Sequence, residues 1–232
     1  MIKSIQTGCE CLDKYLDGGI PSESITLIYG EPETGKSTLA MQCAISCALQ
    51  QKKTLYIDCD NTFSSFRLSQ LTSINFKEIA NLILLLKPIN FKEQTHVIDH
   101  LLEYTAKNFG LVVIDTFTSL YRASIGNNSK NTFILNRELN RQLAVLAQNA
   151  KTQKLPIIIT SQVRNVFGES FVSVEPVATR VLKFWADIII SMKPLEDPQI
   201  ILAEIEKKAN ATYNSYCNLR INGTGIHNCD VF

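Results

Sequence analysis

Eight residues, from Gly30 to Ser37, carry the most specific chemistry in this sequence. They read Gly-Glu-Pro-Glu-Thr-Gly-Lys-Ser, which is a complete P-loop pattern. Its glycines let the backbone curl so that successive N–H groups point at phosphate, and the N-terminus of a following helix adds to the field. Lys36 would reach the β- and γ-phosphates, and the Ser37 hydroxyl would bind Mg²⁺. The motif therefore predicts a nucleoside triphosphate site made of Gly30, Glu31, Pro32, Glu33, Thr34, Gly35, Lys36, Ser37 and Thr38.

Both flanks of the P-loop fit this prediction. The apolar run 25–29 precedes it and is typical of a buried strand, and the apolar stretch 38–45 follows it as a core helix would. A chance glycine turn in front of a core helix is the alternative interpretation. Because the motif and both flanks agree, the phosphate-binding interpretation is the stronger one.

An acidic residue stands where a P-loop enzyme needs a second magnesium ligand. Asp115 directly follows the all-apolar run 111–114, which is typical of a strand that is covered on both faces. In such enzymes a carboxylate at the end of a buried strand near the P-loop holds Mg²⁺. Capping of a turn is the alternative role of Asp115, and the nearby P-loop favours the magnesium role.

Hydrolysis of a triphosphate also needs a group that orients or deprotonates the attacking water. Asp58 and Asp60 are the candidates, because both lie near the end of the predicted strand 53–58. Gln162 follows another apolar strand and could sense the γ-phosphate through a hydrogen bond. A polar residue after a buried strand is otherwise an ordinary loop residue, so Gln162 alone is a weak signal.

Short apolar runs alternate with helical stretches along the chain, which is typical of a mostly parallel sheet with helices on both faces. The predicted strands in this part are 25–29, 53–58, 82–86, 111–114 and 155–160. Predicted helices lie at 38–45, 91–107 and 136–151. Beyond Lys183 the pattern turns β-rich, with strands at 186–192, 199–206 and 215–221. We expect one α/β domain over residues 1–232, with a C-terminal β-rich extension.

Composition limits the setting in which such a protein works. The 23 basic and 22 acidic residues give a net charge of +1, so nucleic acid would bind through a local patch only. The seven cysteines are an odd number without repeated spacing, which is typical of reduced thiols in the cytosol, and Cys43 and Cys47 would pack in a helix core. No run approaches a membrane span, and the first residues lack an apolar signal region. The sequence therefore predicts a soluble, cytoplasmic protein.

Several further segments resemble the core of the RecA-type recombinases, in particular archaeal RadA and its shorter paralogue RadB. They are Thr7-Gly8, Leu12-Asp13, Gly18-Gly19-Ile20-Pro21, the P-loop, Tyr56-Ile57-Asp58, residues 113–122, residues 140–146 and residues 159–163. The resemblance runs from about Thr7 to Ile226 and implies a RecA-type P-loop NTPase core with ATP and Mg²⁺ as its cofactors. RadA proteins carry an additional N-terminal domain and a polymerisation linker, whereas this sequence starts at the core, as RadB-like proteins do.

The resemblance also implies roles for single residues. It implies that Lys36, Gln162 and Asp60 are the catalytic residues. Asp60 stands where RadA-like proteins have a glutamate that acts as the catalytic base. The aspartate side chain is shorter by one C–C bond, or about 1.5 Å. Because a misplacement of about 1 Å can cost on the order of a hundredfold in rate, Asp60 predicts slow hydrolysis with ATP binding retained. Arg67 matches an arginine that the family places against adenine, although a solvated arginine at a helix start is equally consistent.

RecA-type proteins bind DNA through two loops, which correspond here to residues 121–131 and 164–179. The candidate DNA-binding residues are Arg122, Lys130, Arg164, Arg180 and Lys183. So few positive charges predict weak, salt-dependent binding without sequence preference, and each residue alone could be a solvated surface charge. Phe167 and Phe171 could stack on bases or pack on the core.

The resemblance implies an ATP- and DNA-binding accessory protein of homologous recombination and DNA repair, with weak Mg²⁺-dependent ATP hydrolysis. Single-stranded or branched DNA, a RadA-like recombinase and a Holliday-junction nuclease are the implied partners, and a homo-oligomer is compatible with the family. Three alternatives remain open. They are an active strand-exchange recombinase, a KaiC-like signalling ATPase without a DNA role, and a nucleotide-dependent scaffold that does not hydrolyse ATP.

Two residue pairs have weaker functional interpretations. Lys207 and Lys208 end a predicted strand, where basic residues of related ATPases reach the nucleotide of a neighbouring subunit; protection of an exposed strand edge is the favoured alternative. His96 and His100 lie four residues apart on one helix and could suggest a metal. Without a cysteine cluster beside them, a solvated helix face is the favoured interpretation.

Overall fold

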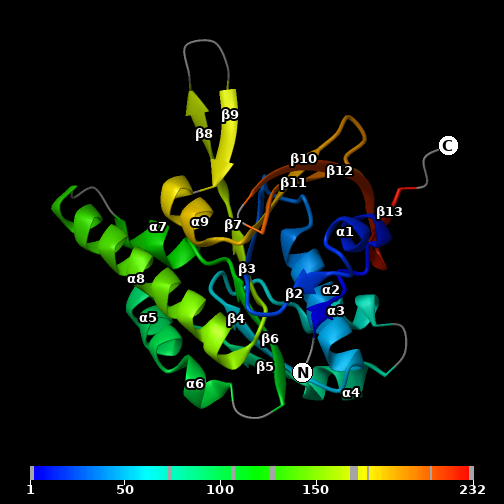
Figure 1. Cartoon of the computed structure of the whole chain (residues 1–232), viewed down its shortest axis with the longest axis horizontal. Coiled ribbons are helices and arrows are strands. Elements are labelled where there is room, and N and C mark those ends of the chain that lie inside the picture. The colour runs from blue at the N-terminus through cyan, green and yellow to red at the C-terminus, as the bar shows by residue number, and fades with distance from the viewer. Residues whose placement is uncertain are drawn as a thin grey trace.

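A nine-stranded sheet organises the part of the chain that the structure describes (Figure 1). The structure is a computed structural model that describes residues 3–72, 75–105, 108–125, 129–167, 172–176, 178–209 and 211–229, without the side chains of residues 129–131, 164–167, 172–176 and 179. Across the sheet the strands are β13 (Gly225–Asn228), β12 (Ala211–Asn222), β11 (Ile200–Lys208), β10 (Ile188–Pro194), β3 (Ile25–Gly30), β7 (Ile157–Ser161), β6 (Phe109–Asp115), β4 (Lys53–Asp58) and β5 (Ile83–Leu86).

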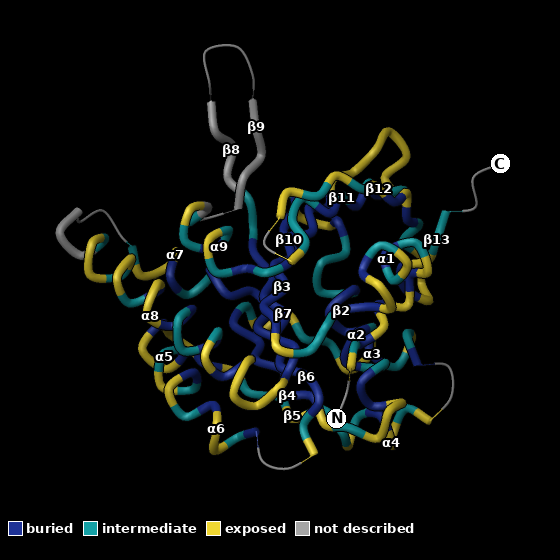
Figure 2. Tube along the Cα trace, viewed as in Figure 1, coloured by how far each residue is buried: buried dark blue, intermediate teal, exposed yellow. Residues whose placement is uncertain are grey.

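The sheet has a parallel half and an antiparallel half. From β10 through β3, β7, β6 and β4 to β5, all neighbouring strands are parallel. Neighbours from β10 to β13 are antiparallel. The central strands are buried along their whole length, as their continuous apolar sequences predict, whereas β11 alternates between buried and partly exposed residues (Figure 2). This arrangement confirms the predicted mostly parallel α/β fold with a C-terminal β-rich extension.

Helices cover both faces of the sheet. On one face lie α1 (Glu10–Tyr15), α2 (Lys36–Leu49), α3 (Ser65–Leu71) and α4 (Phe76–Asn81). On the other face lie α5 (Phe91–Asp99), α6 (Leu101–Tyr104), α7 (Ser119–Ile125), α8 (Ser129–Gln153) and α9 (Thr179–Trp185). Alternate strand residues join opposite cores, so that Leu27 packs under the second group and Ile28 under the first.

Two predicted helices have different limits in the structure. The predicted helix 91–107 is interrupted at His100, whose φ of −100° and ψ of 20° leave helical geometry and separate α5 from α6. The predicted helix 136–151 begins earlier, at Ser129 of α8. Leu135 packs against the same core as Leu139, so the apolar spacing that defines the helix continues toward its N-terminus.

The second predicted DNA loop, residues 164–179, is largely regular structure. Its backbone forms a hairpin of β8 (Val163–Phe167) and β9 (Val172–Pro176), followed by the start of α9. Valine recurs in both strands and β8 ends with Phe167, and β-branched and aromatic residues favour this conformation. The hairpin projects from the body of the molecule in Figure 1. A second two-stranded antiparallel sheet, formed by β1 (Ser4–Ile5) and β2 (Ile20–Pro21), was not predicted.

The expectation that all cysteines are reduced is wrong for one pair. Cys11 of α1 and Cys217 of β12 form a disulfide, although 206 residues separate them in the sequence. The fold brings their Cα atoms to 6.0 Å, a distance that a disulfide spans, and chain spacing carries no signal of this proximity. Cys43 and Cys47 are free thiols buried in the core around α2, as predicted.

Among the described residues, no helix combines the length and the apolar character that crossing a membrane requires.

Candidate nucleotide-binding site

The P-loop joins the buried end of β3 to the first turn of α2. A Cβ atom at Gly30 would lie 2.1 Å from the Met192 carbonyl oxygen of the neighbouring strand, so only glycine fits there. Gly35 has a φ of +86°, which glycine adopts without strain. A Cβ atom at Gly35 would lie 2.7 Å and 2.8 Å from the Cδ1 atoms of Ile221 and Ile226. Close packing against β10 and against the hairpin β12–β13 therefore fixes the course of the loop.

The N-terminus of α2 offers hydrogen-bond donors to an anion. The helix begins at Lys36, and its N-cap residue is Gly35. Glycine has no side chain that could accept hydrogen bonds from the first N–H groups of the helix. N–H groups of a first helical turn lack partners within the helix and carry partial positive charge. A curled backbone that admits only glycine at two positions, together with these open donors, fits a triphosphate.

The Lys36 amine lies folded against the P-loop itself. Its Nζ donates a hydrogen bond to the Glu31 carbonyl oxygen and a weaker one, at 3.4 Å, to the Thr34 hydroxyl. Burial lowers the pKa of Lys36 to about 8, while Asp115, Glu31 and Asp60 favour the charged form. A partly desolvated cation beside the loop is suited to pair with phosphate oxygens.

This lowered pKa predicts a pH-dependent affinity for nucleotide. Below pH 8 the amine is already charged, whereas above pH 8 it must take up a proton to pair with phosphate. Affinity should therefore fall above pH 8 by up to about tenfold per pH unit, because one unit corresponds to about 1.4 kcal/mol. Calorimetry at pH 9 in two buffers of different ionisation enthalpy should detect proton uptake on binding. Binding at pH 9 without proton uptake would contradict this role of Lys36.

Asp115 is held rigidly at the end of β6. Its Oδ2 accepts a hydrogen bond of 2.7 Å from the Tyr56 hydroxyl on β4, and its Oδ1 accepts one from the Thr160 hydroxyl on β7. Burial raises the pKa of Tyr56, and the nearby Asp115 raises it further, so the phenol stays a neutral donor. Both neighbouring strands thus orient one buried carboxylate, as a magnesium ligand requires. Sequence reasoning missed Tyr56 and Thr160 because their role depends on the strand order.

The described residues contain no cluster of three or more His, Cys, Asp or Glu side chains that could enclose a metal by themselves. Mg²⁺ usually takes one or two protein ligands together with phosphates and water, so Ser37 and Asp115 suffice as candidates. His96 and His100 contact each other through their Nδ1 atoms at 2.7 Å and gather no further metal ligands within the described chain.

The structure separates the two acidic candidates for the catalytic base. Asp58 is buried, and its carboxylate accepts hydrogen bonds of 3.0 Å from the backbone N–H groups of Thr62 and Phe63. An ion pair with Lys87 at 3.5 Å adds to this, so Asp58 closes the loop after β4. Asp60 is half-buried, makes no hydrogen bond to any described residue, and lies near enough to Lys36 to influence its pKa.

Gln162 and Arg122, predicted for different tasks, lie in contact. The Gln162 side-chain oxygen accepts a hydrogen bond from the Arg122 guanidinium of α7. Gln162, the residue that follows β7 in the chain, is half-buried, and Arg122 is exposed. The structure thus joins the residue proposed to sense the γ-phosphate to a residue proposed to bind DNA.

Arg67 lies in α3 beside the hairpin that packs on the P-loop. Its guanidinium donates hydrogen bonds to the Gly223 carbonyl oxygen at 2.8 Å and the Asn222 carbonyl oxygen at 3.1 Å. A third bond, at 3.3 Å, goes to the Gln70 side chain. The arginine therefore binds the turn between β12 and β13.

The remaining predicted DNA-binding residues differ in exposure and in their contacts. Arg180 is exposed on α9, whereas Lys183 forms an ion pair of 2.8 Å with Glu206. The backbones of Lys130 and Arg164 lie in α8 and β8, and their side chains lie outside the described part. The same holds for the Phe167 side chain, and Phe171 lies outside the described residues altogether.

Lys207 and Lys208 bond within the chain. Lys207 Nζ donates to carbonyl oxygens at the end of α9, and Lys208 Nζ lies 2.7 Å from Asp17 and 2.6 Å from the Tyr15 carbonyl oxygen. Both amines thus tie β11 to neighbouring elements rather than reaching outward from the described surface.

Comparisons with known proteins agree with this geometry. The family model described as Rad51 matches residues 1–225. The chain is similar to the DNA repair and recombination protein RadB of Thermococcus kodakarensis, with 33% identity over 229 residues that cover 97% of this chain and all of that protein. The corresponding RadB of Methanococcus maripaludis strain C7 is 30% identical over 217 residues, covering 94% and 98%. A crystal structure of the RadB recombinase superposes with a TM-score of 0.83 at 32% identity, covering 97% of this chain and 100% of that chain.

Proposed function

This chain belongs to the Rad51 family, and from that premise we propose that it is a slow Mg²⁺-dependent ATPase that binds DNA and assists homologous recombination and DNA repair in the cytoplasm. The observation that carries this proposal is the joint placement of a glycine-restricted P-loop, a desolvated Lys36 and a rigidly held Asp115 at one end of the sheet. We also propose that residues 1–232 form a single ATPase domain, since both cores share the same sheet.

Nucleotide binding would use groups that the fold already orients. The first N–H groups of α2 would donate to the phosphates, and Lys36 would move its amine from the Glu31 carbonyl to a phosphate oxygen. Ser37 and Asp115 would hold Mg²⁺, which when bound neutralises developing charge on the phosphates. Arg67 would lie along the base, next to the turn it already contacts.

Hydrolysis would depend on Asp60 as the base that orients and deprotonates the attacking water. A proton would pass from this water to the Asp60 carboxylate. At the same time the water oxygen would attack the γ-phosphorus, and ADP would leave. Lys36 and the backbone N–H groups would stabilise the charge of the transition state. Because the aspartate is shorter than glutamate by about 1.5 Å, its reach is poor and turnover should be slow.

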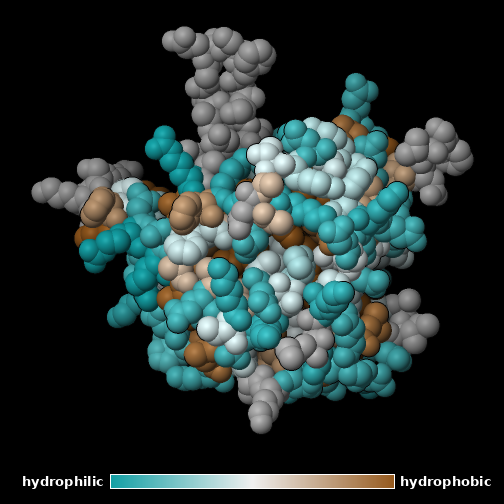
Figure 3. Space-filling view, viewed as in Figure 1, coloured by the Kyte–Doolittle hydropathy of each residue, from teal (hydrophilic) through white to brown (hydrophobic). Residues whose placement is uncertain are grey.

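DNA would bind on the surface formed by α7 and α9. Arg122 and Arg180 are both exposed there. Phe184 lies four residues after Arg180 on α9, so both share one helix face, and its side chain is 74% exposed. Figure 3 shows an apolar patch at α9 within a mainly hydrophilic surface. A cation beside an exposed aromatic ring suits single-stranded DNA, because the cation can pair with a phosphate and the ring can stack on a base.

The contact between Arg122 and Gln162 would link DNA binding to hydrolysis. A DNA phosphate that binds Arg122 competes with Gln162 for the same guanidinium. The released amide could then hydrogen bond to the γ-phosphate. Single-stranded DNA should therefore raise the rate of ATP hydrolysis.

The experiment that tests this function measures DNA affinity and ATP hydrolysis in one set of variants. Replacing Arg122 and Arg180 together by alanine should weaken binding of single-stranded DNA at moderate salt by at least about tenfold. The dependence of log affinity on log salt should become shallower by about 1.4, since each single-strand phosphate contact contributes about 0.7. Stimulation of hydrolysis by DNA should disappear together with binding.

The matched control is Arg220→Ala, which removes the same charge from β12, where the Arg220 side chain is 43% exposed. This variant should keep the native DNA affinity and the native salt dependence. If the double variant binds single-stranded DNA as tightly as the native chain does, the α7–α9 surface is not the DNA site. If the native chain shows no affinity for DNA, its role in recombination does not involve direct DNA contact.

A further inference from the structure

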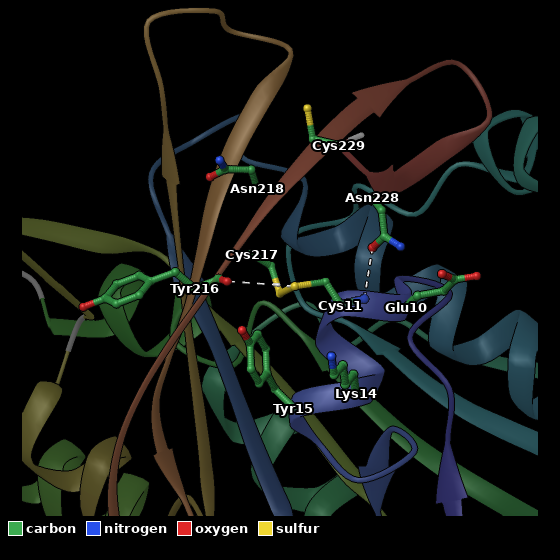
Figure 4. Close-up of a pocket in the computed structure, with 9 residues that line it drawn as sticks. All are labelled: Glu10, Cys11, Lys14, Tyr15, Tyr216, Cys217, Asn218, Asn228 and Cys229. Atoms are coloured by element: carbon green, nitrogen blue, oxygen red, sulfur yellow. Dashed lines mark hydrogen bonds between the residues drawn. A yellow bond between two sulfur atoms is a disulfide. The ribbon is translucent and has the colours of Figure 1, made fainter. Parts of the chain in front are cut away.

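The disulfide between Cys11 and Cys217 lies at a cavity of about 540 Å³ between α1 and β12 (Figure 4). Lys14 and Tyr15 of α1 line it from one side, and Asn218 lines it from the other. Cys11 is half-buried in the wall, whereas Cys217 is buried. Of the two cysteines, Cys11 is therefore the more accessible to a small thiol reagent.

The cavity is structurally connected to the P-loop through β12. Cys217 and Ile221 lie on the same strand, and Ile221 and Ile226 of the hairpin β12–β13 pack against Gly35. Gln42 of α2 binds Ile226 twice, accepting from its N–H at 2.8 Å and donating to its carbonyl at 3.0 Å. The disulfide thus anchors β12, and the C-terminal end of β12 packs against the start of the phosphate-binding helix α2.

We propose that Cys11–Cys217 is a reversible thiol–disulfide modification site, addressed by dithiol reductants, that tunes nucleotide affinity. The proposal rests on the proposed nucleotide-binding function and adds its regulation. A disulfide that reagents can reach in a compartment rich in thiols is suited to such exchange.

The exchange is balanced with a dithiol as the reductant. One thiolate of the reductant attacks the Cys11 sulfur, the S–S bond breaks, and Cys217 leaves as a thiolate that takes up a proton. The second thiol of the reductant then displaces Cys11, so that the reductant becomes a disulfide and both cysteines become thiols. Lys14 in the cavity wall favours the thiolate that forms, and Glu10, which also lines the cavity, opposes it.

Reduction should loosen the hairpin without releasing it. The Cys11 N–H still donates to the Asn228 side chain at 3.1 Å, and the Cys9 thiol donates to the Ile226 carbonyl at 3.4 Å. The P-loop is then less well pre-organised, so binding must order it at a cost in affinity. We expect the dissociation constant for Mg·ADP to rise about 5- to 10-fold, a usual size for coupling between two sites.

The test compares Mg·ADP binding by the oxidised chain with and without dithiothreitol, using calorimetry. Alkylation of the unfolded, unreduced chain should first reveal five free thiols, corresponding to Cys9, Cys43, Cys47, Cys59 and Cys229. Dithiothreitol should then weaken binding 5- to 10-fold and increase hydrogen exchange in β12 and β13. Cys11→Ser should bind as the reduced native chain does and should not respond to dithiothreitol.

The matched control is Cys229→Ser, because Cys229 lines the same cavity but is not part of the disulfide. It should respond to dithiothreitol as the native chain does. Seven free thiols in the unreduced chain, or equal affinities in both redox states, would overturn the redox proposal alone. Absence of Mg·ADP binding in both states would instead overturn the proposed nucleotide-binding function.

Discussion

A Lys36→Ala variant is expected to hydrolyse ATP about 1,000-fold more slowly than the native chain, since loss of one preorganised transition-state donor costs about 10²–10³ and this donor is also a charge. The structure places the Lys36 amine against the phosphate-binding loop, where it contacts the Glu31 carbonyl. Its removal takes away a charge-assisted hydrogen bond from the γ-phosphate in the transition state. Affinity for Mg·ATP should fall as well, because the ground state uses the same charge.

The same substitution should not weaken the folded chain. Burial lowers the pKa of Lys36 to about 8, so the folded state without nucleotide bears a cost for keeping this amine charged at neutral pH. Removal of the amine should leave the melting temperature unchanged or higher, a common relation between stability and function at active sites. The control is Lys92→Ala, which removes an exposed lysine of α5 and should leave hydrolysis unaltered. Hydrolysis by Lys36→Ala within tenfold of the native rate would refute the proposed role.

Substitution of Asp60 should move the rate in two directions. Asp60→Asn should slow hydrolysis by up to about 100-fold, because a well-positioned general base contributes about 10²–10⁴ and the short aspartate achieves only part of this. Asp60→Glu should raise the rate by about tenfold or more, since the carboxylate gains about 1.5 Å of reach and a misplacement of about 1 Å can cost a hundredfold. Single-turnover measurement of phosphate release would report the chemical step directly. An unchanged or lower rate in Asp60→Glu would count against Asp60 as the base.

Asp58 provides the comparison on the same strand end. Its carboxylate accepts hydrogen bonds from Thr62 and Phe63, so Asp58→Asn should destabilise the fold by about 1–3 kcal/mol. Asp60 makes no such bonds within the described chain, so Asp60→Asn should keep the native melting temperature. Thermal unfolding of both variants would therefore separate the residue that closes the loop from the residue that acts on water.

The sequence was sufficient for the parts of the site that are local in the chain. The P-loop between strand and helix, and Asp115 behind an apolar strand, follow from motif and hydrophobic pattern, and β3, α2 and β6 lie where those patterns predict. The parallel sheet could also be predicted, because its strands are apolar throughout and alternate with helical segments. The ends of the helices were predicted less accurately, as the break at His100 and the start of α8 at Ser129 show.

Other parts of the site depend on contacts between distant segments. Tyr56 and Thr160 hold Asp115 only because β4 and β7 flank β6, an order that no single sequence segment specifies. The packing of the hairpin β12–β13 on Gly35 and the disulfide from Cys11 to Cys217 join opposite ends of the chain. Such long-range pairings result from the whole fold, and local propensity does not report them.

The central claim is that the P-loop from Gly30 to Ser37 binds a nucleotide together with Mg²⁺. Calorimetric titration of the folded native chain with ATP at pH 7, in the presence and absence of Mg²⁺, tests it most directly. We expect one nucleotide per chain, an affinity that rises with Mg²⁺, and a loss of this binding in Lys36→Ala. A folded native chain that gives no binding signal with Mg·ATP, or one that Lys36→Ala reproduces unchanged, would contradict the claim.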